Sequence, residues 1–206
     1  MEKILAQGKG AIVLVPEIAL TPQLVGRFSA RFPGRIAVLH SDLGQAERRS
    51  HWDRIRQGEA QIVIGARSAV FAPVKNLGLI VVDEEHETSF KQDDKLRYHA
   101  RDVAIVRGSI CGAKVVLGSA TPSLESMANV QSSRFDYSIL KSRVMDRPMP
   151  KIVFVDLRHS DALYRQDLPW LSRLLVERRE HTRSQGKQAL FYLNRLGFAH
   201  FLFCTA

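Results

Sequence analysis

The stretch Leu79-Ile80-Val81-Val82-Asp83-Glu84-Glu85-His86 places four apolar residues directly before three acids and a histidine. The apolar run predicts a buried strand, and open α/β sheets bind their ligands at the carboxyl ends of strands. Asp83 and Glu84 are therefore candidates to hold a metal ion or to polarise water, as nucleotide hydrolysis requires. A solvated acidic turn is the alternative, and a motif this short leaves it open.

The composition is that of a soluble globular protein with a basic surplus. The chain has 206 residues, 45% of them hydrophobic and 25% charged, which is enough for one full domain and part of a second. A formal net charge of +9 favours polyanionic partners such as nucleic acid. The sequence shows neither a bilayer-spanning apolar run nor a secretory signal, so we expect a cytoplasmic protein without membrane association. Two cysteines, Cys111 and Cys204, argue against a disulfide framework.

Strand-like apolar runs alternate with amphipathic helical stretches, a pattern typical of an α/β domain with a parallel sheet. The expected strands are 11–15, 35–39, 61–65, 79–82, 114–118 and 136–140, and the expected helices are 22–32, 45–57, 100–110 and 123–129. Thr21 before Pro22 is a suitable start for the first helix, because threonine caps helices and proline fits their first turn.

Prolines and basic residues interrupt this periodicity at 141–150, which indicates a linker. We therefore predict a first domain over residues 1–142, a linker over 143–150 and the incomplete start of a second domain over 151–206. In this last part the sequence favours a strand at 151–156, a helix around 169–180 and a strand at 188–193.

Three further clusters of small, hydroxyl and basic residues follow predicted strands, at 16–23, 65–68 and 118–122. If the strands are parallel, all of these clusters share one sheet edge with the acidic turn. Hydroxyls and helix-start amides suit phosphate contacts, and Arg67 adds a charge-assisted bond. Each cluster also has a plainer interpretation, because Ser119 and Thr121 are suitable helix caps and Arg67 is a typical surface ion-pair residue.

Taken together, the motifs resemble those of a known enzyme family. Four stretches carry the resemblance, namely Val15-Pro16-Glu17-Ile18, Gly65-Ala66-Arg67-Ser68, Asp83-Glu84-Glu85-His86 and Gly118-Ser119-Ala120-Thr121-Pro122. In that order, they are similar to motifs Ia, Ib, II and III of superfamily 2 helicases. Further matching stretches are Thr88 to Gln92, Arg97 to Asp102 and Phe191 to Ala199. They resemble the PriA family of bacterial replication-restart helicases (primosomal protein N′). The resemblance covers nearly the whole chain.

The resemblance implies a RecA-like parallel sheet flanked by helices, as the first motor lobe of a helicase. It implies that Asp83 holds the magnesium ion bound to ATP and that Glu84 orients or deprotonates the attacking water. His86 would link the nucleotide site to Ser119 and Thr121. The parent protein would be an ATP-dependent helicase that moves 3′ to 5′ and acts in primosome assembly at stalled replication forks.

The resemblance also implies a DNA surface, because aromatic faces stack on bases and arginine pairs with phosphate. The expected partners are single-stranded and forked DNA, together with other primosome and single-strand-binding proteins. Two alternatives stay open, namely that Phe90 and Tyr98 pack beneath a loop and that His99 caps the following helix. The residues assigned to DNA are Pro16, Thr21, Arg67, Ser68, Phe90, Arg97, Tyr98 and His99.

The sequence also departs from the family pattern. It contains no Gly-x-x-x-x-Gly-Lys-Ser/Thr phosphate loop, and Leu196 stands where the family commonly has a second arginine. Cys204 would be a zinc ligand only in a complete chain, so zinc is not expected here. We therefore expect a piece of a helicase with negligible ATPase activity by itself. The alternative function is a DNA-binding or protein-interaction module without ATPase activity.

Overall fold

The computed structural model describes residues 1–141, 150–165, 168 and 170–192. The chain divides into two units, Met1–Ile139 and Leu140–Ala206, and each is described by itself. Within the described part of the chain, no helix is both long enough and apolar enough to cross a membrane.

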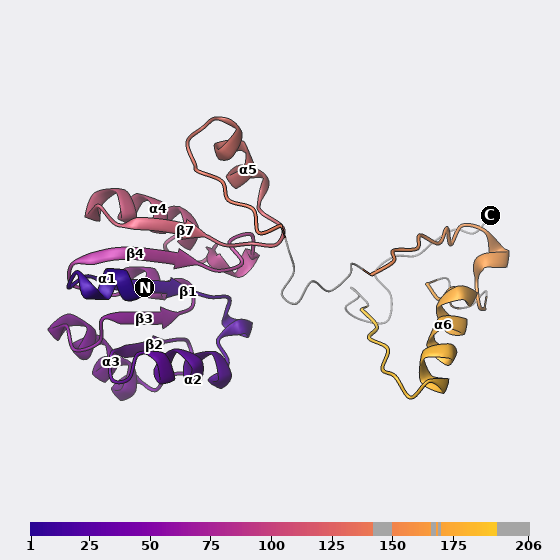
Figure 1. Ribbon diagram of the computed structural model, residues 1–206, viewed down its shortest axis with the longest axis horizontal. Helices are drawn as coiled ribbons and strands as arrows, with labels where there is room; N and C mark the ends of the chain where they lie inside the picture. Colours follow the sequence, from indigo (N-terminus) through magenta and orange to yellow (C-terminus); the bar gives the residue numbers. More distant parts are fainter. Residues whose placement is uncertain (142–149, 166–167, 169, 193–206) are drawn as a thin grey trace. The chain divides into compact units, whose positions relative to one another are not determined.

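A parallel sheet of five strands forms the centre of the first unit (Figure 1). Its order is β2-β3-β1-β4-β7, and every neighbouring pair is parallel. The central strand β1 is buried along its whole length, as expected for a strand covered on both faces. The strands are β1 (Gly10–Leu14), β2 (Ile36–Leu39), β3 (Ile62–Gly65), β4 (Leu77–Val82) and β7 (Lys114–Leu117).

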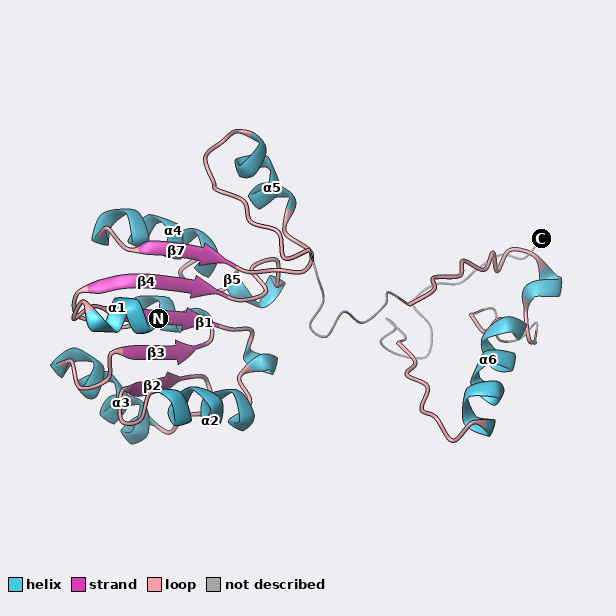
Figure 2. Cartoon of the chain, viewed as in Figure 1, coloured by secondary structure: helices cyan, strands magenta, loops and turns pink. Residues whose placement is uncertain are grey.

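Helices connect these strands and cover both faces of the sheet (Figure 2). Three short 3-10 helices and a small antiparallel pair of strands, β5 (Lys91–Gln92) and β6 (Tyr98–His99), complete the unit. The α-helices are α1 (Glu2–Ala6), α2 (Pro22–Arg31), α3 (Gln45–Gln57), α4 (Ala100–Cys111) and α5 (Leu124–Gln131), and the 3-10 helices are η1 (Glu17–Ala19), η2 (Arg67–Phe71) and η3 (Thr88–Phe90).

Alternate residues of β1 supply the two halves of the hydrophobic core. Ile12 and Leu14 pack with residues of α3 and α4 in one cluster, while Val13 packs with residues of α1 and α2 in the other. This alternation follows from the two-residue period of a strand. The α/β architecture expected from the sequence, a parallel sheet flanked by helices, is confirmed.

One predicted strand of the first unit is wrong. Residues 136–140 have no regular structure, and Tyr137, Ile139 and Leu140 are exposed. A strand requires a hydrogen-bonding neighbour, and β7 pairs with β4 without any pairing to residues 136–140 among the described residues. The apolar pattern alone does not provide that neighbour.

The second unit departs further from the expectations. Its described elements are η5 (Ser160–Ala162) and α6 (Arg173–Ser184), with an antiparallel bridge between Leu163 and Ser172. The helix expected from 169 begins later, where Ser172 accepts a bond from the Leu175 amide; residue 169 lies outside the described residues. The strands predicted at 151–156 and 188–193 are wrong where they are described, because residues 151–156 and 188–192 have no strand structure; residue 193 lies outside.

Candidate functional site

The four polar clusters predicted to share a sheet edge do so. Leu14 pairs with both Gly65 and Val82, and Val82 pairs with Leu117, so β1, β3, β4 and β7 end at the same level. Backbone bonds extend this register into the loops, because the Asp83 amide donates to the Leu14 carbonyl at 2.9 Å. The acidic turn thus lies between the loops that follow β1 and β7.

The three acids of the turn differ in how far their side chains are exposed. Asp83 is exposed and Glu84 half-buried, whereas Glu85 is only 1% exposed. Glu84 has a φ of +47°, a left-handed conformation that is uncommon for a residue with a side chain. The Glu84 amide donates to Asp83 Oδ1 at 3.1 Å, and the Glu87 amide donates to the Glu84 carbonyl at 2.8 Å. This turn sends two successive carboxylates in different directions.

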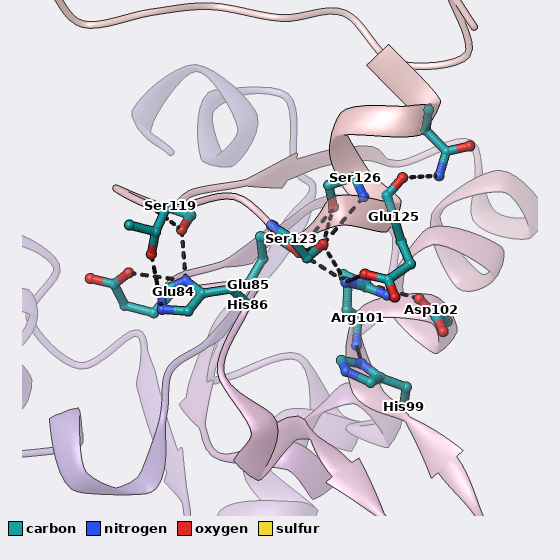
Figure 3. Close-up of polar contacts among 12 residues, drawn as sticks. Glu84, Glu85, His86, His99, Arg101, Asp102, Ser119, Ser123, Glu125 and Ser126 are labelled. Atoms are coloured by element: carbon teal, nitrogen blue, oxygen red, sulfur yellow. Dashed lines mark hydrogen bonds and ion pairs between the residues drawn. The ribbon is translucent and has the colours of Figure 1, made fainter. Parts of the chain in front are cut away.

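His86 connects the acidic turn to the loop after β7 (Figure 3). Its Nδ1 lies 2.7 Å from Ser119 Oγ and 3.7 Å from a Glu84 carboxylate oxygen, and its Nε2 lies 3.4 Å from Thr121 Oγ1. The Thr121 amide donates to Ser119 Oγ at 3.0 Å. The structure therefore brings together the residues to which the family resemblance gave a coupling role. Ser119 and Thr121 do not cap α5, because Ser123 occupies the N-cap position.

Glu85 is the centre of a second polar network, which the sequence reasoning missed (Figure 3). Its Oε1 accepts from the Ser123 amide at 2.7 Å, and its Oε2 accepts from Arg101 Nη1 at 3.1 Å. Oε2 also lies 3.1 Å from Ser123 Oγ and 3.0 Å from Ser126 Oγ. The one signal in the sequence was that three acids stand in a row. A magnesium ion and an attacking water require only two of them, which leaves the third without a role.

Opposing effects set the protonation of this buried pair. Burial by itself raises the pKa of the Glu85 carboxyl, but bonds from the Ser123 amide, Arg101 and Ser126 outweigh it and hold the pKa below its ordinary value. Burial likewise lowers the pKa of Arg101, while its bonds to Asp102 and Glu85 raise it by more. Both groups are therefore charged at neutral pH, as a buried ion pair.

Asp83 fits the role of a magnesium ligand. Magnesium bound to a nucleotide is usually held by one or two carboxylates together with phosphate oxygens and water. Asp83 is exposed at the sheet edge, and Glu84 follows it directly. No group of three or more His, Cys, Asp or Glu side chains suited to a metal occurs among the described residues.

The DNA candidates in the loops after β1 and β3 differ in their surroundings. Pro16 is buried, whereas Ser68 on η2 is exposed. Thr21 caps α2, because its Oγ1 accepts from the Leu24 amide at 3.3 Å. Arg67 Nη1 donates to the carbonyls of Ser89 at 3.4 Å and Lys91 at 2.5 Å. One nitrogen of Arg67 therefore holds the loop that follows the acidic turn.

The loop from 88 to 99 requires one correction. Phe90 is 1% exposed and belongs to the core, so its ring has no free face for a base; of the two interpretations, packing beneath the loop is the one the structure shows. The Tyr98 ring contacts the Phe71 ring edge to face at 5.1 Å and is half-buried. Arg97 is exposed.

His99 caps α4, because its Nδ1 accepts from the Arg101 amide at 3.3 Å. Burial first, and then the charge of Arg101, lower the pKa of His99. Cys204, the predicted zinc ligand of a complete chain, lies outside the described residues, as does Leu196.

Comparison with known proteins finds a helicase family and its replication-restart members. The profile of the DEAD/DEAH box helicase family matches residues 1–130. The chain is 48% identical over 204 residues to the replication restart protein PriA of Bacillus subtilis and 46% identical over 204 residues to that of Haemophilus influenzae. Each match covers 99% of this chain but 25% and 27% of the relatives, so the chain spans about a quarter of their length.

A solved structure of the C-terminal domain of the DEAD-box protein Dbp5 aligns with a TM-score of 0.46 at 17% identity, covering 66% of this chain and 78% of the other.

Proposed function

Because the chain belongs to the DEAD/DEAH box helicase family, we propose that it is the motor-lobe part of an ATP-dependent DNA helicase that acts in replication restart. The observation that carries the proposal is the contact of His86 with Ser119 and Thr121 at the carboxyl edge of the sheet. This contact joins an acidic turn suited to nucleotide chemistry to a second loop at the same edge.

The geometry suggests a division of labour among the residues of the turn. Asp83 would hold the magnesium ion of Mg·ATP, and this ion would neutralise negative charge on the β- and γ-phosphates. Glu84, whose carboxylate is partly exposed, would orient the attacking water or accept its proton. His86, which contacts Ser119 on one ring nitrogen and Thr121 on the other, would transmit a shift of the turn to the loop after β7.

The proposed DNA surface is smaller than the sequence predicted. Ser68 and Arg97 are exposed and would contact phosphates, because hydroxyl and guanidinium groups are suited to them. Arg67 would contribute the nitrogens that do not hold the loop, and Tyr98 the ring face that does not meet Phe71. Thr21 and His99 act as helix caps, so any DNA contact from them would be secondary.

The remaining features of the proposal extend to the whole protein. We propose that residues 1–142 form an ATP-binding lobe, 143–150 a linker and 151–206 the start of a second lobe. Movement in the 3′ to 5′ direction, action on forked DNA, partnership with primosome and single-strand-binding proteins, zinc binding in the complete protein and a bacterial cytoplasmic location remain predictions. The alternative is a DNA-binding or interaction module without ATPase activity.

DNA binding is measured with this chain and a fluorescently labelled oligonucleotide at several salt concentrations. We expect weak, sequence-tolerant binding that falls as salt rises, because displaced counterions drive it. Arg97→Ala should reduce the slope of log affinity against log salt by about one, and Tyr98→Ala should cost about 1 kcal/mol. Arg67→Ala should also flatten the slope.

Arg56→Ala is the matched control, because Arg56 is an exposed arginine paired with Asp53 near the end of α3, just before the amino end of β3. Its removal should leave the slope nearly unchanged. Salt-independent binding, or an equal effect of Arg56→Ala and Arg97→Ala, would contradict the proposed surface.

Hydrolysis is tested in the whole protein that carries this sequence. Glu84→Gln there should lower DNA-stimulated ATP turnover by about 100-fold or more and leave DNA affinity unchanged, because the amide keeps the shape but accepts no proton. Turnover that survives Glu84→Gln would exclude Glu84 from water activation. A wild-type protein that binds DNA but shows no turnover would favour the alternative.

A further inference from the structure

Glu85 differs from its neighbours because it is directed away from the exposed edge where Asp83 and Glu84 lie. Its side chain is 2% exposed, and a buried charge is tolerated only when it is paired and hydrogen-bonded. Both carboxylate oxygens are occupied by protein donors. Glu85 is therefore buried and held by protein donors, and its function must be sought in the groups that it holds.

The donors to Glu85 come from two elements that are distant from it in sequence. Arg101 is the second residue of α4, and Ser123 is the N-cap of α5. Arg101 Nη1 also donates to Ser123 Oγ at 2.7 Å, so the three side chains contact one another. The Glu85 carboxylate at the start of α5 satisfies an amide that the helix leaves unpaired, and its charge suits the helix dipole. The network thus fixes where α4 and α5 begin.

The backbone of Glu85 makes the same connection. Its amide donates to the Gly118 carbonyl at 3.0 Å, and the Gly118 amide donates to the Val82 carbonyl at 2.8 Å. Gly118 directly precedes Ser119, and Ser123 follows Thr121 by two residues. The Ser119–Thr121 segment is therefore attached to Glu85 at both ends, by the Glu85 main chain on one side and its carboxylate on the other.

From this geometry we infer that Glu85 and Arg101 form a positioning pair that sets the distance between the acidic turn and the Ser119–Thr121 segment. The contacts of His86 depend on this distance, because its ring joins the acidic turn to Ser119 and Thr121. Both side chains are largely buried, so the pair acts through the groups that it holds. Its effect on turnover, but not its effect on the His86 contact, rests on the proposed function.

Nuclear magnetic resonance of the chain tests the pair directly, through the ring resonances of His86 and the exchange rate of the Ser123 amide. Glu85→Gln and Arg101→Gln should each displace the His86 resonances. Each should also accelerate Ser123 amide exchange by roughly ten-fold or more, because a bond to a charged acceptor is weakened or misplaced. The double variant should move both signals back toward wild type, because it leaves no unpaired buried charge.

Glu125→Gln is the matched control, because Glu125 is an exposed carboxylate 4.0 Å from the same Arg101 nitrogen. It should change neither signal. The backbone resonances of β1 and β3 report whether each variant is folded. If a glutamine variant does not fold, Arg101→Lys decides the question, because lysine keeps the charge but lacks the planar fork that reaches several partners at once.

A wild-type position of the His86 resonances in Glu85→Gln or Arg101→Lys would overturn the inference, as would strictly additive effects of the single changes in the double variant. In the whole protein, Glu85→Gln should lower kcat for ATP by roughly 10- to 100-fold while changing KM less than two-fold. A normal kcat combined with displaced His86 resonances would contradict only the effect of the pair on turnover. A wild-type protein without turnover would count against the proposed function and leave the pair intact.

Discussion

Glu84 and Glu85 are adjacent in the chain, yet they belong to two different polar networks (Figure 3). The first network, made of Glu84, His86, Ser119 and Thr121, is largely exposed and lies at the sheet edge. The second, around Glu85, is buried and connects three segments. Groups that face solvent remain available to a ligand, whereas buried groups satisfy one another. The comparison therefore separates residues that are open to a ligand from residues that hold them in place.

The largest expected effect comes from breaking the buried network. Glu85→Ala leaves the Arg101 guanidinium, only 10% exposed, without its buried partner, and such a change typically costs about 3–5 kcal/mol. The free energy of unfolding is measured by urea denaturation. Glu125→Gln, which removes an exposed partner of the same arginine, should cost less than about 0.5 kcal/mol. Equal losses in the two variants would mean that burial is not what distinguishes these carboxylates.

A smaller effect is expected from the cap of α5. Ser123→Ala removes the hydroxyl that accepts from the Ser126 amide, and it also removes a donor within reach of Glu85, so we expect a loss of about 1–2 kcal/mol. Thr21→Ala is the matched variant, because Thr21 caps α2 on the exposed surface; it should cost about 0.5–1 kcal/mol. A Thr21 cap worth more than the Ser123 cap would show that the buried network adds nothing to the cap.

The pH dependence of stability tests the buried side of the comparison at the start of α4, where His99 is the N-cap. The pKa values of His99 and His51 are lowered, by burial first and by a nearby arginine second. The unfolded chain therefore takes up protons on these rings before the folded chain does. Their contribution is fully present above the ordinary histidine pKa of about 6.5 and is lost as the pH falls below it, toward the folded values.

His99→Asn isolates the part that belongs to α4, because asparagine is also a good N-cap but does not titrate. Urea midpoints at pH 7 and pH 5 should differ less in this variant than in the wild type. Some pH dependence should remain, because His51 is unchanged and its Nδ1 still accepts from the Val38 amide. An identical pH dependence in both proteins would contradict the role assigned to His99.

The sequence predicted those features that depend on short-range pattern. Apolar runs identified all five strands of the sheet, and the α3 boundaries agree with the expectation of 45–57. The shared edge of the polar clusters followed from parallel topology, and it brought His86 to Ser119. These predictions succeed because a buried parallel strand is apolar throughout its length and because helix ends carry local signals such as Thr21.

The failures involve partners that are distant in sequence. Phe154 is apolar but 94% exposed, and it lies in a predicted strand that does not form, because strand formation depends on a neighbour. Glu85 was missed, and Phe90 was assigned to the DNA surface, for the same reason. Whether a side chain is exposed or buried depends on what packs over it, and Arg101 and Ser123 reach Glu85 across 16 and 38 residues of chain.

The smallest expected change in stability comes from the exposed network. His86→Ala and Ser119→Ala each remove the 2.7 Å contact between the acidic turn and the following loop, yet both should alter the free energy of unfolding by no more than about 0.5 kcal/mol. The reason is that water replaces the lost partner at a partly exposed site, whereas Glu85 is only 1% exposed. The same urea experiment that is used for Glu85→Ala measures both variants. A loss as large as that of Glu85→Ala would show that His86 holds the fold together, and the division between a chemical network and a supporting network would then no longer hold.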